Sequence, residues 1–387
     1  MIRAAAVREG RETSRASRFT TRHRRGELMS DHRGHQQRIG PRRGRAVGRR
    51  VAWLTILAAL ALVAAACQTT ATPGDQGEKL KVFGAFATQI EEPWDGVIHT
   101  ALQAEQTAGR IDYSYQDDIG YAGDMERVLR EVAEKDKPDI IFGDAFGNEE
   151  AARSVAKDFP AIAFVFGSGG GPAEPNFSVF DNWIHEPAYL AGMLAGGLTK
   201  TGTVGVVGGY PVPEVNRIVN AFIAGAQAVN EDVTVKVTFI NSWFDPAAAK
   251  EAALAQVAAG ADVLYAERFG VIEAASEKGL VAIGNMSDQK SLAPGSVVTS
   301  VTWNMGPTVK YVIDQVLAGS YTAQDLKDFS MVAKGGAALA AINTAVPGGV
   351  PDALLQQVTT REAEIKAGTF RVDIVENQPA GSTVVGG

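Results

Sequence analysis

Residues 139–157 read DIIFGDAFGNEEAARSVAK, and this stretch contains the pattern that decides the fold. A short run of β-branched and aromatic residues, 139–143, is followed by an acid-x-Phe-Gly turn and then by an Ala-rich amphipathic run, 149–157. The first run is typical of a buried strand and the last of a helix. The stretch therefore predicts a strand, a loop and a helix in immediate succession.

The same alternation continues along most of the chain from residue 79. Expected strands are 80–86, 111–116, 139–143, 161–167, 203–208, 233–240, 261–266, 280–284, 297–301 and 328–333. Expected helices are 94–106, 124–135, 149–157, 187–199, 214–229, 246–259, 272–278, 306–318 and 351–367. Strands that alternate with helices imply parallel sheets covered by helices on both faces, so the sequence predicts an α/β fold.

Residues 262–278, DVLYAERFGVIEAASEK, repeat the opening pattern. Either two units of one sheet resemble each other by chance, or the chain contains two related α/β lobes. Ligands of parallel sheets sit at the carboxyl ends of the strands, so facing lobes would point both loops at one place. Each loop would supply an acidic acceptor and an aromatic face. The candidate ligand-binding residues are Asp144, Phe146, Glu267 and Phe269.

The charge of the 387-residue chain is unevenly distributed around a formal net value of −7. Residues 1–50 carry 15 arginines and four acidic residues, whereas the remainder has a net charge of −18. Such an acidic body repels nucleic-acid phosphates, so no nucleic-acid partner is expected. The single cysteine, Cys67, excludes a disulfide framework within the chain and a Cys-based zinc site. No metal or other cofactor is expected.

Residues 1–66 are predicted to be a signal peptide with an Arg-rich n-region. Residues 51–66 contain one polar residue, Thr55, and this run is shorter than the ~20 residues of a spanning helix. A basic segment, a short apolar run and small residues at its end are typical of a secretory signal. Translation that starts at Met29 is an alternative to a start at Met1.

The segment that follows is predicted to be an anchor. Residues 63–67, VAAAC, resemble a bacterial lipobox, which implies that Cys67 becomes the lipidated first residue of the mature chain. Residues 67–78 are rich in Thr, Pro, Gly and Gln, which favours a flexible tether. We therefore expect a domain that is lipid-anchored on the outer face of the cytoplasmic membrane or in the periplasm.

Several motifs in the body resemble the basic membrane protein family, whose members are lipoprotein substrate-binding components of ABC importers. The motifs are KTGTVGVVGG at 200–209, NAFIAG at 220–225, AYLAG at 188–192, SWFDP at 242–246, GADV at 260–263 and AIG at 282–284. They spread over most of the predicted mature chain with the spacing that the family implies. Each motif is weak alone, and the set is specific.

The resemblance implies a type I periplasmic-binding-protein fold. In that fold, two doubly wound parallel-sheet lobes joined by a hinge close over a small ligand. The first lobe is expected to contain 79–183 and 302–330, and the second 184–301 and 331–375, with a frayed tail at 376–387. The chain would cross between lobes near 181–185, 301–304 and 328–331, where Trp183 and Trp303 could pack in the hinge instead of touching ligand.

The resemblance also suggests individual site residues. The family's first binding segment corresponds to 91–95, so Trp94 is expected to stack on a base and Asp95 to be its polar neighbour. The family's ribose-binding Asp corresponds to Met286, beside Asn285, and its following Lys corresponds to Trp303. Both replacements remove groups that bind sugar hydroxyls. A planar heteroaromatic without ribose, such as a free purine base, therefore fits Trp94, Asp95, Asp144, Asn285 and Trp303 better than a nucleoside does.

The function expected from these residues is capture of a small heteroaromatic ligand, of purine base or nucleoside type, by a monomer that delivers it to an ABC permease and ATPase. One alternative is a ligand-sensing lipoprotein that signals to a membrane partner, and another is a hydrolase on the same fold. The Gly-rich stretch 167–172 fails the Gly-x-Gly-x-x-Gly pattern and no Gly-x-Ser-x-Gly elbow occurs, so no enzyme activity is expected. Arg268 could bind a ligand carboxylate or pair with Glu267.

Overall fold

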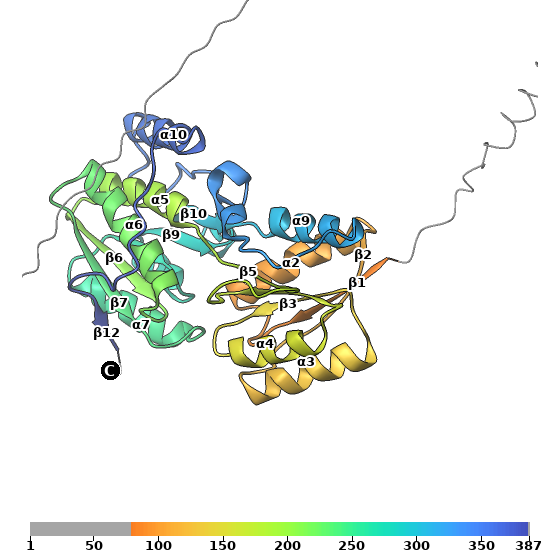
Figure 1. Ribbon diagram of the computed structural model, residues 1–387. Helices are drawn as coiled ribbons and strands as arrows, with labels where there is room; N and C mark the ends of the chain where they lie inside the picture. Colours follow the sequence, from red (N-terminus) through yellow and green to blue (C-terminus); the bar gives the residue numbers. More distant parts are fainter. Residues whose placement is uncertain (1–78, 386–387) are drawn as a thin grey trace, which may run out of the picture. The chain divides into compact units, whose positions relative to one another are not determined.

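The computed structural model describes residues 79–385, and these form two sheets flanked by helices (Figure 1). The first sheet has the strand order β2-β1-β3-β4-β5 and the second β11-β10-β9-β8-β6-β7-β12. All neighbouring strands are parallel except the β10–β11 pair. The predicted α/β fold with two parallel sheets is confirmed.

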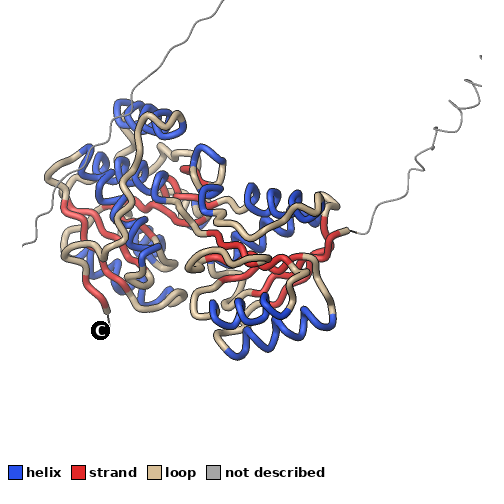
Figure 2. Tube along the Cα trace, in the orientation of Figure 1, coloured by secondary structure: helices blue, strands red, loops and turns tan. Residues whose placement is uncertain are grey.

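The strands of the described residues are β1 (Leu80–Ala85), β2 (Ile111–Gln116), β3 (Ile140–Asp144), β4 (Ala163–Gly167), β5 (Phe177–Phe180), β6 (Thr203–Gly208), β7 (Thr234–Phe239), β8 (Val263–Ala266), β9 (Val281–Met286), β10 (Val297–Trp303), β11 (Ala337–Leu339) and β12 (Thr383–Val384). The helices are α2 (Pro93–Thr107), α3 (Gly123–Lys135), α4 (Glu149–Asp158), α5 (His185–Leu198), α6 (Pro213–Val229), α7 (Pro246–Ala258), α8 (Val271–Glu277), α9 (Gly306–Leu317) and α10 (Asp352–Lys366). Figure 2 shows how these helices flank the strands.

Helices cover both faces of the first sheet because successive residues of its strands point to opposite sides. Val82 and Ile140 pack with Ile98 of α2, whereas their neighbours Phe83 and Ile141 pack into a separate core with α3 and α4. The second sheet is built in the same way, with α5 and α6 on one face and α7 and α8 on the other. Strands buried on both sides explain the continuous apolar runs in the sequence.

Two glycines from the family-like motifs let α5 and α6 approach closely. A Cβ on Gly192 would lie 2.0 Å from the carbonyl oxygen of Phe222, and one on Gly225 would lie 1.9 Å from that of Tyr189. Such distances exclude any side chain at either position. The AYLAG and NAFIAG motifs therefore encode a helix–helix contact under the second sheet.

The chain returns to the first sheet after β10. Helix α9 lies beside α2, and residues 324–326 hydrogen-bond to Val179 along the edge of β5 (Figure 1). The three segments predicted as crossings touch one another, since Trp303 Nε1 donates to Ser330 Oγ and Ser330 Oγ donates to the carbonyl of Asp181. The predicted lobe boundaries remain a prediction.

Three features of the structure differ from what the sequence predicts. Residues 328–333 do not form a strand but two short 3-10 turns, Lys327–Ser330 and Val332–Lys334. The short strands β5, β11 and β12 were not expected, because each contains four residues or fewer and gives little periodicity. Residues 376–385 are not frayed, since Glu376 pairs with Arg217 and β12 joins the edge of β7.

Candidate functional site

The site begins at the start of α2, where local sequence places two predicted binding residues. The Glu92 carboxylate caps the helix, because its Oε2 accepts the backbone N–H groups of Trp94 at 2.8 Å and Asp95 at 3.3 Å. Pro93 stands at the first helical position, where no N–H donor is needed. Capping fixes the first turn, which directs Trp94 and Asp95 toward the space beyond the strand ends.

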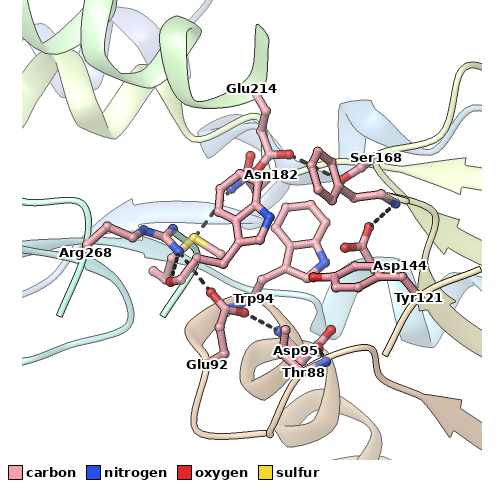
Figure 3. A pocket seen from close by; sticks show the side chains of 13 residues that line it. Thr88, Glu92, Trp94, Asp95, Tyr121, Asp144, Ser168, Asn182, Glu214 and Arg268 are labelled. Atoms are coloured by element: carbon pink, nitrogen blue, oxygen red, sulfur yellow. Dashed lines mark hydrogen bonds and ion pairs between the residues drawn. The ribbon is translucent and has the colours of Figure 1, made fainter. Parts of the chain in front are cut away.

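A pocket lies at the carboxyl ends of strands from both sheets (Figure 3). Its position follows the general rule that ligands of parallel sheets bind at the carboxyl ends of the strands. The lining residues are Thr88, Glu92, Trp94, Asp95, Tyr121, Asp144, Phe146, Ser168, Asn182, Glu214, Trp243, Arg268 and Met286. The pocket thus combines four aromatic side chains, four acidic ones and a single guanidinium.

Trp94 is held in place by other aromatic rings. Its ring lies 4.7 Å from that of Trp303 and is stacked on Phe180 at 6.3 Å, measured between centroids. On the other side of the pocket, the rings of Phe146 and Trp243 meet edge to face at 5.2 Å. Aromatic faces at fixed positions are suited to a planar ligand, because ring–ring contacts depend on geometry as well as on buried area.

Asp95 and Asp144 are acidic acceptors with few partners. Asp95 Oδ2 accepts the backbone N–H of Thr88 at 3.0 Å and its hydroxyl at 2.6 Å, while Asp95 Oδ1 is buried without a partner. Burial, followed by the neighbouring Glu92 and Asp144, raises the pKa of Asp95 well above its usual value. Burial likewise raises the pKa of Asp144 to about 7, although its Oδ1 accepts the Phe146 N–H at 3.1 Å.

Glu214 extends this acidic character to the second sheet. It lies in the first turn of α6, and its Oε2 accepts the Ser168 hydroxyl at 3.2 Å. Burial and the nearby Asp181 carboxylate raise the pKa of Glu214 well above its usual value. The positive end of the helix dipole favours a carboxylate at this position.

Arg268 connects the two sheets through a network of buried charges. Its guanidinium contacts Glu267 at 2.5 Å and, from the opposite sheet, Glu92 at 3.2 Å. It also donates to the carbonyl of Trp243 at 2.8 Å. Burial raises the pKa of Glu92, and Arg268 opposes that rise. The structure thus places Arg268 in an ion pair with Glu267, one of the two roles considered from the sequence.

Four of the predicted binding residues line the pocket together: Trp94, Asp95, Asp144 and Phe146. The other four, Glu267, Phe269, Asn285 and Trp303, do not line it. The Glu267 carboxylate turns inward and accepts the Gly209 N–H at 2.9 Å, and Asn285 accepts the Tyr265 hydroxyl at 2.7 Å. Phe269 packs edge to face against Phe244. Two of these residues contact pocket residues instead: Trp303 packs against Trp94, and Glu267 pairs with Arg268.

Sequence reasoning missed most of the remaining lining residues: Thr88, Glu92, Tyr121, Ser168, Asn182, Glu214 and Trp243. Most of them lie in loops that follow strands, so their position at strand ends was the available signal. Ser168 belongs to the Gly-rich stretch 167–172, and Trp243 belongs to the SWFDP motif. Their convergence depends on tertiary structure that no local pattern reports.

Met286 lines the pocket at the end of β9 in an unusual backbone conformation. Its φ is 67°, a region that residues other than glycine seldom adopt and that is concentrated at functional sites. The side-chain N–H of Asn182 donates to the sulfur of Met286 at 3.5 Å. The side-chain oxygen of Asn182, Oδ1, is buried without a partner. Across residues 79–385, no three Asp, Glu, His or Cys side chains are grouped so that they could hold a metal ion.

Residues 88–332 match the family model Bmp, described as ABC transporter substrate-binding protein PnrA-like. The chain belongs to this family. The Bmp family comprises solute-binding components of ABC transporters, not enzymes, and substrate-binding proteins of ABC importers work on the extracytoplasmic side of the membrane. The resemblance found in the sequence motifs is thereby confirmed.

Two curated relatives support this assignment. A purine-binding protein of Brucella abortus is 33% identical over 57% of this chain and 63% of its own length. An ABC transporter nucleoside-binding protein of Lactococcus lactis subsp. cremoris is 29% identical over 52% of this chain and 53% of its own length. The chain thus spans between one half and two thirds of these relatives.

A solved structure shows the fold of the Bmp-family chain. An ABC transporter solute-binding protein from Conexibacter woesei superposes with a TM-score of 0.63 at 23% identity, over 76% of this chain and 99% of its own. The periplasmic-binding-protein type of fold expected from the sequence is confirmed.

Proposed function

We propose that this Bmp-family chain captures a small planar heteroaromatic solute of purine-base type outside the cytoplasm and delivers it to the permease and ATPase of an ABC importer. The single observation that carries the proposal is the pocket in which the fixed ring of Trp94 stands beside Asp95 and Asp144. The rings offer faces for stacking, and the carboxylates accept hydrogen bonds along a ligand edge. The purine-binding relative supports the same ligand class.

The absence of a sugar site at two positions favours a base over its nucleoside. Met286 lines the pocket with an apolar side chain, and Trp303 lies behind Trp94 with its Nε1 committed to Ser330. A ribose would bring hydroxyl groups to these positions. Each hydroxyl left without a partner in a closed pocket costs about 1–3 kcal/mol, and stacking contributes equally to base and nucleoside.

Calorimetric titration of the soluble body with adenine, hypoxanthine, guanine and their nucleosides tests the proposal. We expect saturable binding of at least one base, with a lower Kd than that of the corresponding nucleoside. D-glucose and small carboxylates serve as negative ligands. Tighter binding of nucleosides would contradict the base preference, and the absence of binding by every purine would contradict the ligand class itself.

The proposed site of action includes a lipid anchor at Cys67, which lies outside the described residues, as do the signal peptide predicted for 1–66 and the tether predicted for 67–78. Within residues 79–385, no helix has the length and apolar character needed to span a bilayer. We expect Cys67→Ser to move the protein from the membrane fraction to the soluble fraction of cells. A variant that stays in the membrane fraction would contradict anchoring through this residue.

A further inference from the structure

The lining of the pocket carries more acidic than basic side chains. Four carboxyl side chains line it, and the guanidinium of Arg268 is its only cationic group among the described residues. Each nitrogen of that guanidinium already donates within the protein: Nε and Nη2 to Glu267, and Nη1 to Glu92 and the carbonyl of Trp243. Arg268 is therefore committed to its two carboxylates and offers no free charge to a ligand.

The other three carboxyl groups have no cation of their own. Asp95, Asp144 and Glu214 form no ion pair with any residue in 79–385. Like charges near one another in a low-dielectric pocket repel, and this repulsion is relieved when protons or a cation enter. Burial is the main cause that raises the pKa values of these groups, and neighbouring carboxylates add to the rise.

The hydrogen-bond partners missing from the pocket are mainly donors. Asp95 Oδ1 and Asn182 Oδ1 are buried acceptors without a partner, whereas Trp94 Nε1 is a buried donor without one. Asp95 and Asn182 are 2% and 3% exposed, so bulk water does not readily satisfy them. A buried polar atom without a partner is costly, which means that a well-fitting ligand would bring more donors than acceptors to this part of the pocket.

The aromatic side chains complete a pattern suited to a positive charge. Trp94, Tyr121, Phe146 and Trp243 line the same pocket as the three unpaired carboxyl groups. Aromatic faces attract cations through the ring quadrupole, most strongly for tryptophan, and the attraction increases when the cation is desolvated. The combination of ring faces and carboxylates matches a planar cation with N–H donors at its edge.

We propose that this pocket selects a planar ligand that carries a positive charge, of the amidinium or protonated aminoheterocycle class, over neutral ligands of the same shape. The proposal rests on the proposed function, since it names the charge of the solute that the same site captures. Asp95 and Glu214 would accept N–H groups of the ligand from opposite sheets. Trp94 would cover one face of its ring.

Benzamidine and benzamide test the proposal because they have nearly the same shape and differ in charge. Calorimetry at pH 7 should give a Kd for benzamidine that is lower than that for benzamide by roughly tenfold or more, the size expected when hydrogen bonds to charged groups replace neutral ones. In the double variant Asp95→Asn, Glu214→Gln, the ratio of the two Kd values should approach one. These substitutions keep the side-chain shapes and remove the groups that can carry a negative charge beside a cation.

Glu149→Gln is the matched control, because Glu149 is an acidic residue that pairs with Arg153 and does not line the pocket. It should leave the ratio unchanged, and thermal melts should show that all variants are folded. Equal affinity for benzamide and benzamidine, or a double variant that keeps the wild-type ratio, would overturn the charge preference. If adenine binds in either of those cases, the proposed function stands alone; if no purine and neither probe binds, the proposed function fails as well.

Discussion

The loop at Asp144 and the loop at Glu267 have the same acid-x-Phe-Gly sequence, follow equivalent strands, and behave differently in the structure. In the first loop, Asp144 and Phe146 both line the pocket. In the second loop, Glu267 turns into the protein and Phe269 packs against Phe244. Equivalent positions in two similar units thus have different roles, one toward the pocket and one toward the protein interior.

The residue between the acid and the phenylalanine accounts for this difference. In the first loop it is Ala145, which is buried and provides no charge, so Asp144 has no cation beside it. In the second loop it is Arg268, which binds Glu267 at 2.5 Å and extends to Glu92. A buried carboxylate with a guanidinium beside it becomes part of the framework, whereas one without such a partner remains available to a ligand.

The largest effect is expected from removal of the cation in the second loop. Arg268→Ala leaves Glu267 and Glu92 buried without their partner, and loss of one member of a buried pair lowers the free energy of unfolding by about 3–5 kcal/mol. Urea denaturation measures this change. Arg127→Ala is the control, since its ion pairs are exposed and contribute only about 0–1 kcal/mol. Similar losses in both variants would contradict a framework role for Arg268.

The next effect concerns the ring beside the first loop. Trp94→Ala removes a stacking face and the apolar area around it, so the Kd for adenine should rise by about 30- to 100-fold, or about 2–3 kcal/mol. Trp183→Ala provides the comparison, because Trp183 packs against Arg217 and Lys327 and does not line the pocket. Trp94→Phe should retain part of the affinity. Unchanged adenine binding in folded Trp94→Ala would exclude Trp94 as a stacking residue.

The two acids should also differ in their effect on stability. Because burial raises the pKa of Asp144 to about 7, the folded state keeps a proton that the unfolded chain releases near pH 4. The free energy of unfolding therefore decreases as the pH rises from about 4 to 7. At pH 8, Asp144→Asn should be more stable than the wild type by on the order of 1–2 kcal/mol.

Glu267→Gln should instead lower the free energy of unfolding, because it removes the carboxylate that lies nearest to Arg268. Thermal melts from pH 4 to pH 8 measure both variants against the wild type. A destabilised Asp144→Asn at pH 8 would mean that Asp144 is ionised and satisfied in the folded protein, which would place it in the same class as Glu267.

The smallest effect is expected at Met286, the position that the sequence resemblance matches to a ribose-binding acid. Met286→Asp adds an acceptor for a hydroxyl group and should lower the Kd for adenosine by about tenfold, or about 1.4 kcal/mol. Met286→Leu is the control, because it keeps the apolar character. A competition titration with adenine and adenosine measures the change. If both variants bind adenosine as the wild type does, the sugar lies elsewhere.

Much of the fold could be predicted from the sequence, and only part of the site. Alternation of apolar strands and amphipathic helices is a local pattern, so the long elements of both sheets were predicted to within about two residues at most ends. The short strands β5, β11 and β12 have no such periodicity. The repeated acid-x-Phe-Gly motif indicated Asp144 and Phe146, and both line the pocket. The motif could not show that Arg268 would pair with Glu267, because that depends on side-chain direction after folding.

A crystal structure of the chain with adenine tests the division between the two loops most directly. We expect the adenine ring against Trp94, with its N–H groups within hydrogen-bond distance of Asp95 or Asp144, while Glu267 keeps its contact with Arg268. A ring that lies against Phe269 with its edge on Glu267, or one bound outside the pocket, would contradict the assignment of the first loop to the ligand and the second to the framework.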